Sequence, residues 1–197
     1  MGRIVAVVSL TLDGVMQAPG RAGEDVRGGF DDGGWALPYR DEVMSRVMGE
    51  GMAEGGPLLF GRRTYEDFFS VWPARKGNPV SEVLDRSHKY VASRTLSSPL
   101  PWQNSTLLSG NAEETVALLK GQLEKDLTVL GSGDLLQTLM RRRLVDEYLL
   151  LVHPLVLGRG RRLFEDPAPR SGLGLVGSVT TTSGVVIATY RPREEAA

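Results

Sequence analysis

The sequence predicts one α/β domain with a mostly parallel sheet and an antiparallel hairpin at its carboxyl end. Three observations lead to this fold class. Short apolar runs rich in β-branched residues alternate with helical patterns through most of the 197 residues. Glycine-containing turns follow several of these runs directly. The last two runs, 173–182 and 185–191, are separated by a turn around Ser183 and Gly184, as in a hairpin. No repeat or linker divides residues 1–197, so a single domain is expected.

The first half is expected to begin with a strand and a long loop. Residues 3–10 are short, apolar and β-branched, which predicts a buried strand. Residues 11–36 are rich in glycine and charge and lack apolar periodicity. They predict a loop, and loops of that length typically bind or cover something. The elements expected next are the helix 39–52, the strand 57–60, the helices 64–71 and 79–85, and the strands 88–92 and 105–108.

The second half repeats the alternation. Asn111, with Glu114 three positions later, predicts a capping box at the start of a helix that continues to Leu123. Residues 127–130 then predict a buried strand. A helix follows with apolar residues on one face, and 145–152 predicts a long strand. We therefore expect the sheet to be built from strand–helix–strand units.

Charge and composition exclude several classes of function. The net charge is −1, so the chain has no general attraction to nucleic acid or to anionic membranes. The absence of cysteine excludes disulfides, thiolate metal sites and a cysteine nucleophile. The apolar run near the amino terminus ends before Asp13 and is too short for a signal-peptide core or a membrane span. We expect a cytoplasmic protein whose partner is a small molecule.

Two glycine turns are the strongest functional signal. Gly61 to Glu66 and Gly131 to Leu135 each follow an apolar run and open into a helix. Glycine lets backbone N–H groups approach a ligand, and the start of a helix favours phosphate. Arg62, Arg63 and Thr64 would add charge and a hydrogen bond at the first turn, and Ser132 and Gly133 complete the second. The structural alternatives are an ordinary turn capped by Thr64 and a flexible helix cap.

A third polar cluster follows the strand 88–92. Ser93, Arg94 and Thr95 combine hydroxyl groups with a guanidinium, which suits a phosphate monoester. A solvated loop is the alternative. All three clusters follow strands, and open α/β sheets bind ligands at the carboxyl ends of their strands. A dinucleotide, which has several anionic groups, is the natural candidate.

Four ordered segments resemble the dihydrofolate reductase-like superfamily. More closely, they are similar to the branch named for the C-terminal reductase domain of the bifunctional riboflavin-pathway deaminase/reductase. The resemblance covers about residues 3–190 and predicts a three-layer sandwich. The matching segments are 7–16 (VVSLTLDGVM), 61–66 (GRRTYE), the turn 131–133 (GSG), and 154–160 with Leu163 and Phe164.

The resemblance implies an NADPH-binding site. Gly61, Arg62, Arg63 and Thr64 would hold cofactor phosphates, with Arg62, Ser93 and Arg94 near the 2′-phosphate. Gly131 to Leu135 would contact the pyrophosphate. Ser9, at the end of the first strand, would lie near the nicotinamide. The resemblance also suggests a homodimer. Residues 148–152 and 185–188 would lie either at its interface or in the monomer's own core.

The chain departs from the family at its acidic residue. Dihydrofolate reductases carry an acid after a segment similar to Trp35–Pro38, where it assists protonation. The ungapped equivalent here is Arg40, and a one-residue shift gives Asp41. Asp13 is a second candidate acid, with stabilisation of its own Asp-Gly turn as the alternative. The deaminase zinc signature needs cysteine, so the bifunctional enzyme is excluded.

The remaining chemistry-bearing residues give weaker indications. His88 and His153 are isolated, so no metal site is predicted. An aromatic wall for a planar substrate is an alternative to core packing for Trp35, Phe68, Phe69 and Trp72. Taken together, the sequence predicts an NADPH-dependent reductase that transfers a hydride to a C=N or C=O bond of a small, heterocyclic substrate. An NADPH-binding sensor without turnover is the alternative.

Overall fold

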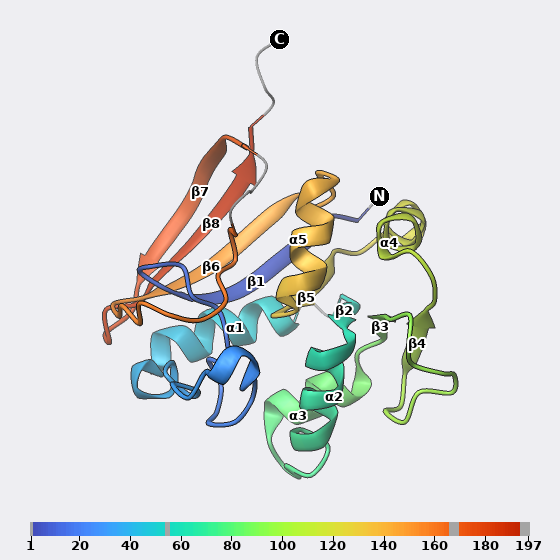
Figure 1. The fold of residues 1–197 in the computed structure, drawn as a ribbon, viewed down its shortest axis with the longest axis horizontal. Coiled ribbons are helices and arrows are strands. Elements are labelled where there is room, and N and C mark those ends of the chain that lie inside the picture. Colours follow the sequence, from blue (N-terminus) through green and yellow to red (C-terminus); the bar gives the residue numbers. More distant parts are fainter. Residues whose placement is uncertain (1, 54–55, 166–169, 194–197) are drawn as a thin grey trace.

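The computed structural model describes residues 2–53, 56–165 and 170–193. One sheet of eight strands forms the centre, in the order β4-β3-β2-β5-β1-β6-β8-β7, and helices cover both of its faces (Figure 1). The predicted α/β class and the three layers are therefore confirmed. The strands are β1 (Ile4–Thr11), β2 (Leu58–Gly61), β3 (Lys89–Ala92), β4 (Ser105–Leu108), β5 (Leu127–Leu130), β6 (Glu147–His153), β7 (Leu173–Thr180) and β8 (Val186–Pro192). The α-helices are α1 (Glu42–Ala53), α2 (Arg62–Val71), α3 (Pro79–Arg86), α4 (Ala112–Gln122) and α5 (Gly133–Arg141).

Strand pairing brings the predicted binding segments to one edge of the sheet. Strand β1 pairs in parallel with β5 and β6, and β2 pairs in parallel with β3 and β5. Strand β8 is antiparallel to both of its neighbours, β6 and β7, as the predicted hairpin requires. Gly61 is in register with Ala92, and Val7 with Leu130. The turns after β2, β3 and β5 consequently lie along one edge of the sheet, and the turn after β5 lies beside the carboxyl half of β1.

The alternation of side chains along β1 sorts the helices into two layers. Ile4, Ala6, Val8 and Leu10 are buried in one apolar cluster with residues of α4 and α5. Val7, of opposite parity, packs in a second cluster with residues of α1. A third cluster joins β2 and β3 to α2 and α3. Each fully buried aliphatic or aromatic side chain contributes about 1.5–3 kcal/mol, so this pattern fixes the register of the central strand.

Several predicted boundaries were wrong by a few residues, for local reasons. Helix α2 begins at Arg62, so Thr64 lies inside its first turn and does not cap it. Helix α1 begins at Glu42, after a 3-10 turn at Leu37–Tyr39. Helix α4 ends at Gln122, and the extended backbone of Leu123 closes it with an N–H bond to the Leu119 carbonyl. The strands at 105–108 and 127–130 are as predicted.

The strands suggested as a dimer interface lie inside the sheet of one chain. Strand β6 pairs with β1 and β8, and β8 pairs with β6 and β7. Five of their side chains, Tyr148, Leu150, Leu151, Ile187 and Ala188, are buried in the monomer's own core. The exposed apolar side chains of this region are Val186 of β8 and Leu175 and Val176 of the edge strand β7.

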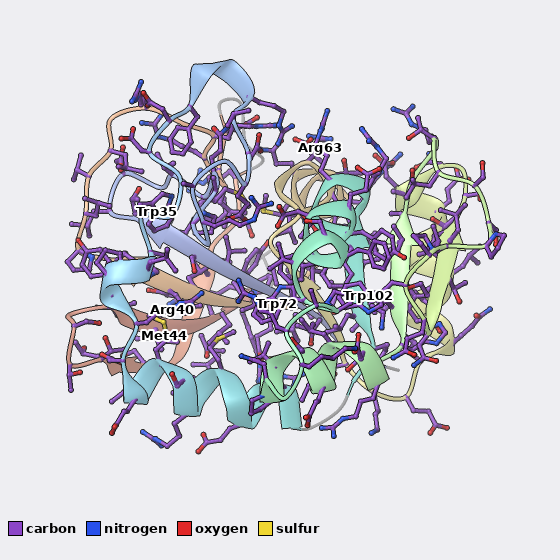
Figure 2. The ribbon with its side chains drawn as sticks, turned by 90° about the horizontal axis from the view of Figure 1, so that it is seen from below. Trp35, Arg40, Met44, Arg63, Trp72 and Trp102 are labelled. Atoms are coloured by element: carbon purple, nitrogen blue, oxygen red, sulfur yellow. The ribbon has the colours of Figure 1, made fainter. Side chains whose placement is uncertain are left out.

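The three tryptophans lie in different parts of the molecule. Figure 2 shows Trp35 among the loop segments that precede α1, whereas Trp72 lies at the end of α2 and Trp102 lies toward β3 and β4. Trp35 and Trp102 are buried. Within the described ranges, no helix is both long and apolar enough to cross a membrane.

Candidate functional site

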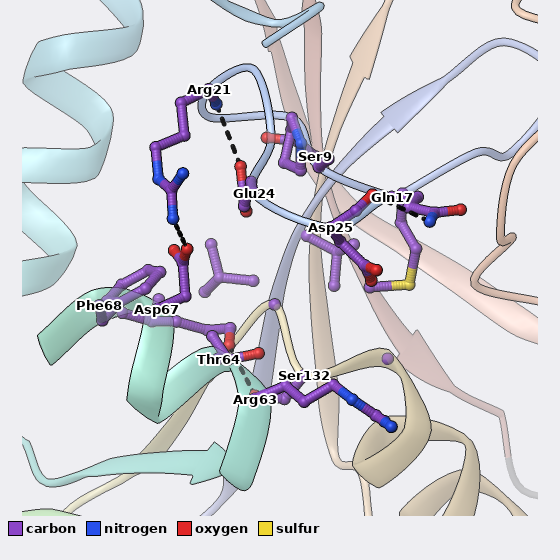
Figure 3. Close-up of a pocket in the computed structure, with 18 of the residues that line it drawn as sticks. Ser9, Gln17, Arg21, Glu24, Asp25, Arg63, Thr64, Asp67, Phe68 and Ser132 are labelled. Atoms are coloured by element: carbon purple, nitrogen blue, oxygen red, sulfur yellow. Dashed lines mark hydrogen bonds and ion pairs between the residues drawn. The ribbon is translucent and has the colours of Figure 1, made fainter. Parts of the chain in front are cut away.

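A cleft of about 680 Å³ opens at the carboxyl edge of β1 and β5. We call it the cleft throughout. The 16–27 segment of the long loop forms one side, α2 forms another, and the turn before α5 forms the floor (Figure 3). Met48 and Met52 of α1 add an apolar wall together with Phe68 of α2 and Trp72, which directly follows α2. Its volume is in the range of small-molecule sites, and it combines apolar walls with charged side chains.

The two predicted glycine turns meet at the floor of the cleft. The hydroxyl oxygen of Ser132 accepts a hydrogen bond from the Gly61 N–H at 3.0 Å, and the same hydroxyl donates to the Leu130 carbonyl at 3.0 Å. Gly131 adopts a φ of 55°, and a Cβ placed there would lie 3.6 Å from Cγ2 of Thr64. The turns are thus in direct contact, and glycine keeps their backbones accessible.

Helices α2 and α5 begin at this floor without a side-chain cap. Gly61 precedes α2 and has no side chain, and the Ser132 hydroxyl is used elsewhere. By contrast, α1, α3 and α4 are capped by Asp41, Asn78 and Asn111, respectively. The first N–H groups of a helix need acceptors, and an anion at that position supplies them. Two adjacent uncapped starts therefore form a surface suited to a diphosphate.

Three arginines surround one carboxylate beside these helix starts. Asp134, in the first turn of α5, pairs with Arg27 at 3.2 Å and Arg63 at 3.1 Å, and also with Arg161. We call this group the three-arginine cluster. Burial opposes ionisation of Asp134, but its bonds to the arginines, that to Arg161 first, outweigh burial and lower its pKa. All four side chains line the cleft.

Glu24 and Asp67 line the cleft where the long loop meets α2. Asp67 of α2 forms an ion pair with Arg21, and the Glu24 carboxylate accepts N–H bonds from Gly20 at 2.6 Å and from Arg21 at 3.1 Å (Figure 3). Burial raises the pKa of Glu24, and the nearby Asp67 adds to the shift. Burial also raises the pKa of Asp67, against the opposing charge of Arg21. Raised carboxyl pKa values in a cleft are typical of functional sites.

Sequence reasoning missed these charged residues of the cleft. Arg27, Glu24 and Arg21 lie in a loop whose side-chain directions no periodicity predicts. Arg161 lies in the segment after β6, and about 100 positions of sequence separate it from Arg63. Asp67 had a usable signal, because it lies four positions after Arg63 and so shares that face of α2.

The structure brings together half of the predicted cofactor residues in the cleft. Ser9, Arg63, Thr64, Gly131, Ser132 and Gly133 line it. Gly61 is joined to this group through Ser132. Leu135 instead is buried in the apolar core. Arg62 is not among the lining residues and pairs with Glu66 at 3.0 Å on the surface of α2.

The third cluster lies at the same sheet edge but outside the cleft lining. The Ser93 hydroxyl accepts N–H bonds from Thr95 and Leu96, both at 3.1 Å, and so closes the turn after β3. Arg94 and Thr95 are exposed. Because β2 and β3 are paired in parallel, this turn lies next to the start of α2. The cluster is positioned to extend the cleft along the edge of the sheet.

The two predicted catalytic acids lie outside the lining of the cleft. Asp13 accepts bonds from the Thr11 hydroxyl at 2.6 Å and from the N–H groups of Leu157 and Gly158, and these bonds lower its pKa to about 2. It ties the start of the long loop to the segment after β6. Asp41 accepts N–H bonds from Met44 and Ser183, both at 2.9 Å, which lower its pKa.

The catalytic roles of Asp13 and Asp41 stay predictions. Both carboxylates accept structural hydrogen bonds. Arg40, the other position considered for the family's acid, is an exposed residue at the rim of the cleft. Helix α1 itself faces the cleft with methionines rather than with an acid.

The predicted aromatic wall is only partly formed. Phe68 and Trp72 line the cleft, whereas Phe69 packs against Tyr65 and Trp102 in the core. Trp35 meets the buried His153 edge to face at 5.1 Å between ring centroids. Among the residues that the structure describes, no three His, Asp or Glu side chains are grouped as metal ligands.

Comparisons with known proteins identify the family. The model of the RibD C-terminal domain matches residues 3–187. The uncharacterized protein YyaP of Bacillus subtilis is 30% identical over 193 residues, which cover 95% of this chain and 94% of that protein.

Solved structures support the same fold. A putative riboflavin biosynthesis protein from Shewanella has a TM-score of 0.72 at 20% identity, covering 98% of this chain and 100% of that one. Dihydrofolate reductase from Enterococcus faecalis, complexed with NADP(H), has a TM-score of 0.62 at 14% identity and 98% coverage of both chains. On the family match and the relative's identity, this chain belongs to the RibD C-terminal domain family.

Proposed function

We propose that this protein is an NADPH-dependent reductase that transfers a hydride to a C=N or C=O bond of a small, heterocyclic substrate. Family membership and the dihydrofolate reductase-like fold favour a reductase-type enzyme. The observation that carries the proposal is the pair of uncapped helix starts, α2 and α5, joined by the Gly61–Ser132 hydrogen bond at the floor of the cleft. Such a pair suits the diphosphate of a dinucleotide.

Different residues would bind different parts of the cofactor. The N–H groups at Arg63 and Thr64 and at Gly133 would receive the diphosphate, while Ser9 would lie beside the nicotinamide. Arg62, Ser93 and Arg94, farther along the sheet edge, would hold the 2′-phosphate and so favour NADPH over NADH. When bound, the cofactor supplies the hydride. The chain supplies orientation, electrostatics and exclusion of water.

Glu24 and Asp67 are the acids best situated to serve a reduction in this cleft. Reduction of a C=N or C=O bond consumes a proton, and burial raises the pKa of both carboxyl groups, which favours their protonated form. The apolar side chains of Met48, Phe68 and Trp72 would hold a planar substrate. The predicted roles of Asp13 and Asp41 are not needed by this arrangement.

The long loop 11–36 is proposed as a lid. Its 16–27 segment already lines the cleft and contacts both walls, through Arg21 to Asp67 of α2 and through Arg27 to Asp134 of α5. Closure over a bound substrate would exclude water.

Calorimetric titration with NADPH and NADH tests the cofactor assignment. The wild type should prefer NADPH, and the preference should shrink in Arg62→Ala and in Arg94→Ala. Arg46→Ala is the matched control, because Arg46 is an exposed arginine of α1 outside the cleft. If the wild type binds neither nucleotide, both the reductase hypothesis and the sensor hypothesis are rejected.

A nucleotide sensor without turnover is the second candidate. The wall that α1 gives the cleft carries Met48 and Met52 and no acid, which favours binding without the usual protonation. Steady oxidation of NADPH with a panel of pterin, flavin-precursor and carbonyl compounds would establish the enzyme. Tight binding of NADPH with no turnover of any compound would favour the sensor. A homodimer, a cytoplasmic location and the absence of nucleic-acid binding stay predictions.

A further inference from the structure

Asp134 is an acid at the place where the proposed function requires the diphosphate to bind. It lies in the first turn of α5, directly after the glycine turn, and its side chain lines the cleft and is 51% exposed. An acid in the first turn of a helix is ordinarily explained by its favourable interaction with the helix dipole. That explanation accounts for the carboxylate, but not for the three arginines that converge on it.

The three arginines come from three separate segments of the chain. Arg27 belongs to the long loop, Arg63 to the first turn of α2, and Arg161 to the segment after β6. Arg27 and Arg63 share one carboxylate oxygen of Asp134, at 3.2 and 3.1 Å, and Arg161 binds the other. Asp134 is therefore surrounded as a bound anionic ligand would be, by guanidinium groups and the start of a helix.

We propose that Asp134 is an internal counter-ion that occupies the anion-binding position of the three-arginine cluster and limits the affinity of the cleft for diphosphate-bearing ligands. The inference rests on the proposed function for the identity of the ligand, but not for the anion site itself. A diphosphate seated on the starts of α2 and α5 would compete with this carboxylate for Arg27, Arg63 and Arg161, and it would also be repelled by the carboxylate's charge.

The other acids near the cluster do not take over this role. Asp25 pairs with Arg27, and Glu165 lies 3.5 Å from Arg161. Each contacts a single arginine of the cluster, whereas Asp134 contacts all three. Removing the Asp134 charge would leave the three guanidinium groups facing the cleft with a net positive potential that a phosphate group can use.

Asp134→Asn tests the proposal, because asparagine keeps the shape of the side chain and is tolerated near the start of a helix. Wild type and variant are titrated with inorganic pyrophosphate and with NADPH at low and at high salt. The variant should bind pyrophosphate roughly tenfold more tightly at low salt, with an advantage that shrinks at high salt as the charges are screened. Adding Arg161→Ala to the variant should remove most of the gain.

Glu113→Gln is the matched control, because it removes one negative charge from an acid that pairs with Arg142, outside the cleft. It should bind pyrophosphate as the wild type does. Equal or weaker pyrophosphate binding by Asp134→Asn, or no pyrophosphate binding by any form, would overturn the counter-ion role of Asp134. Tighter pyrophosphate binding by the variant, together with no NADPH binding by any form, would support that role and reject the proposed cofactor.

Discussion

The hydroxyl oxygen of Ser132 accepts a hydrogen bond from the backbone N–H of Gly61 at 3.0 Å, and this bond joins the two glycine turns of the cleft. The two residues are 71 positions apart in the sequence. The bond satisfies an N–H group at the start of α2 and fixes the distance between the beginnings of α2 and α5. A ligand that spans both helix starts depends on that distance.

Ser132→Ala should therefore lower both stability and ligand affinity. The substitution leaves the partly buried Gly61 N–H without its partner, which costs about 0.5–1.5 kcal/mol of the free energy of unfolding. Urea denaturation measures this loss. Thr138→Ala is the control, because its hydroxyl forms exposed hydrogen bonds, to the Asp134 carbonyl and with Arg141. Equal stability of Ser132→Ala and wild type would contradict the role of this bond.

Substitution by alanine should lower stability by different amounts at two glycines of the segment after β6. Gly158 and Gly160 both have positive φ, at 75° and 110°. A Cβ at Gly158 would meet no atom within 4 Å, but one at Gly160 would lie 2.8 Å from both Phe30 and Val15. Gly158→Ala should cost about 1–2 kcal/mol from backbone strain alone, and Gly160→Ala about 1–3 kcal/mol more from overpacking. Equal thermal denaturation midpoints for the two variants would refute this.

His153 should make stability fall in mild acid. Its Nδ1 donates toward the carbonyls of Leu151 and Leu10, at 2.9 and 3.2 Å, and its Nε2 has no partner among the described residues. Burial lowers its pKa, so the unfolded chain binds a proton more readily than the folded chain does. The contribution of His153 to the free energy of unfolding is complete above its pKa in the unfolded chain, about 6.5. It decreases as the pH falls toward the lower pKa of the folded chain.

Urea midpoints at pH 7.5 and pH 5.5 measure that decrease. His153→Phe should show a smaller drop between the two pH values than the wild type, although it is less stable at pH 7.5 because two carbonyls lose their donor. His88→Gln is the control, and it should retain the drop of the wild type. An undiminished drop in His153→Phe would assign the acid sensitivity to other groups.

The ion pair between Arg21 and Asp67 should hold the long loop against α2. Asp67→Asn removes its charge, so the loop 11–36 should be cleaved faster by proteinase K than in the wild type. NADPH should slow cleavage of the wild type, because closure over the cleft buries the loop. Asp85→Asn, which changes an acid of α3 bonded to Trp102 and outside the cleft, is the control. Cleavage in the loop that neither Asp67→Asn nor NADPH alters would argue against a lid.

The fold was predictable because its signals are local. The apolar run of β1, the Asn111 cap of α4 and the turn at Ser183–Gly184 each predict their own element from a few neighbouring residues. The two glycine turns were predictable for the same reason, since a glycine between a strand and a helix is visible in the sequence. The first residue of a helix was harder to predict. The backbone extends through Gly61 and α2 begins at once, which left Thr64 inside the helix.

The sequence by itself determined the α/β alternation, the mostly parallel sheet with its closing hairpin, and the two glycine turns between strand and helix, because each depends on short-range periodicity and turn chemistry. Only the tertiary structure decided which charged side chains face the cleft. The direction of the 16–27 segment is set by distant contacts, among them the Trp35 indole N–H bonded to the Gln17 carbonyl at 2.7 Å and the pairing of Val15 with Arg162. Such contacts join residues with no common periodicity, so the meeting of Arg27, Arg63 and Arg161 at Asp134 appears only when the chain is folded.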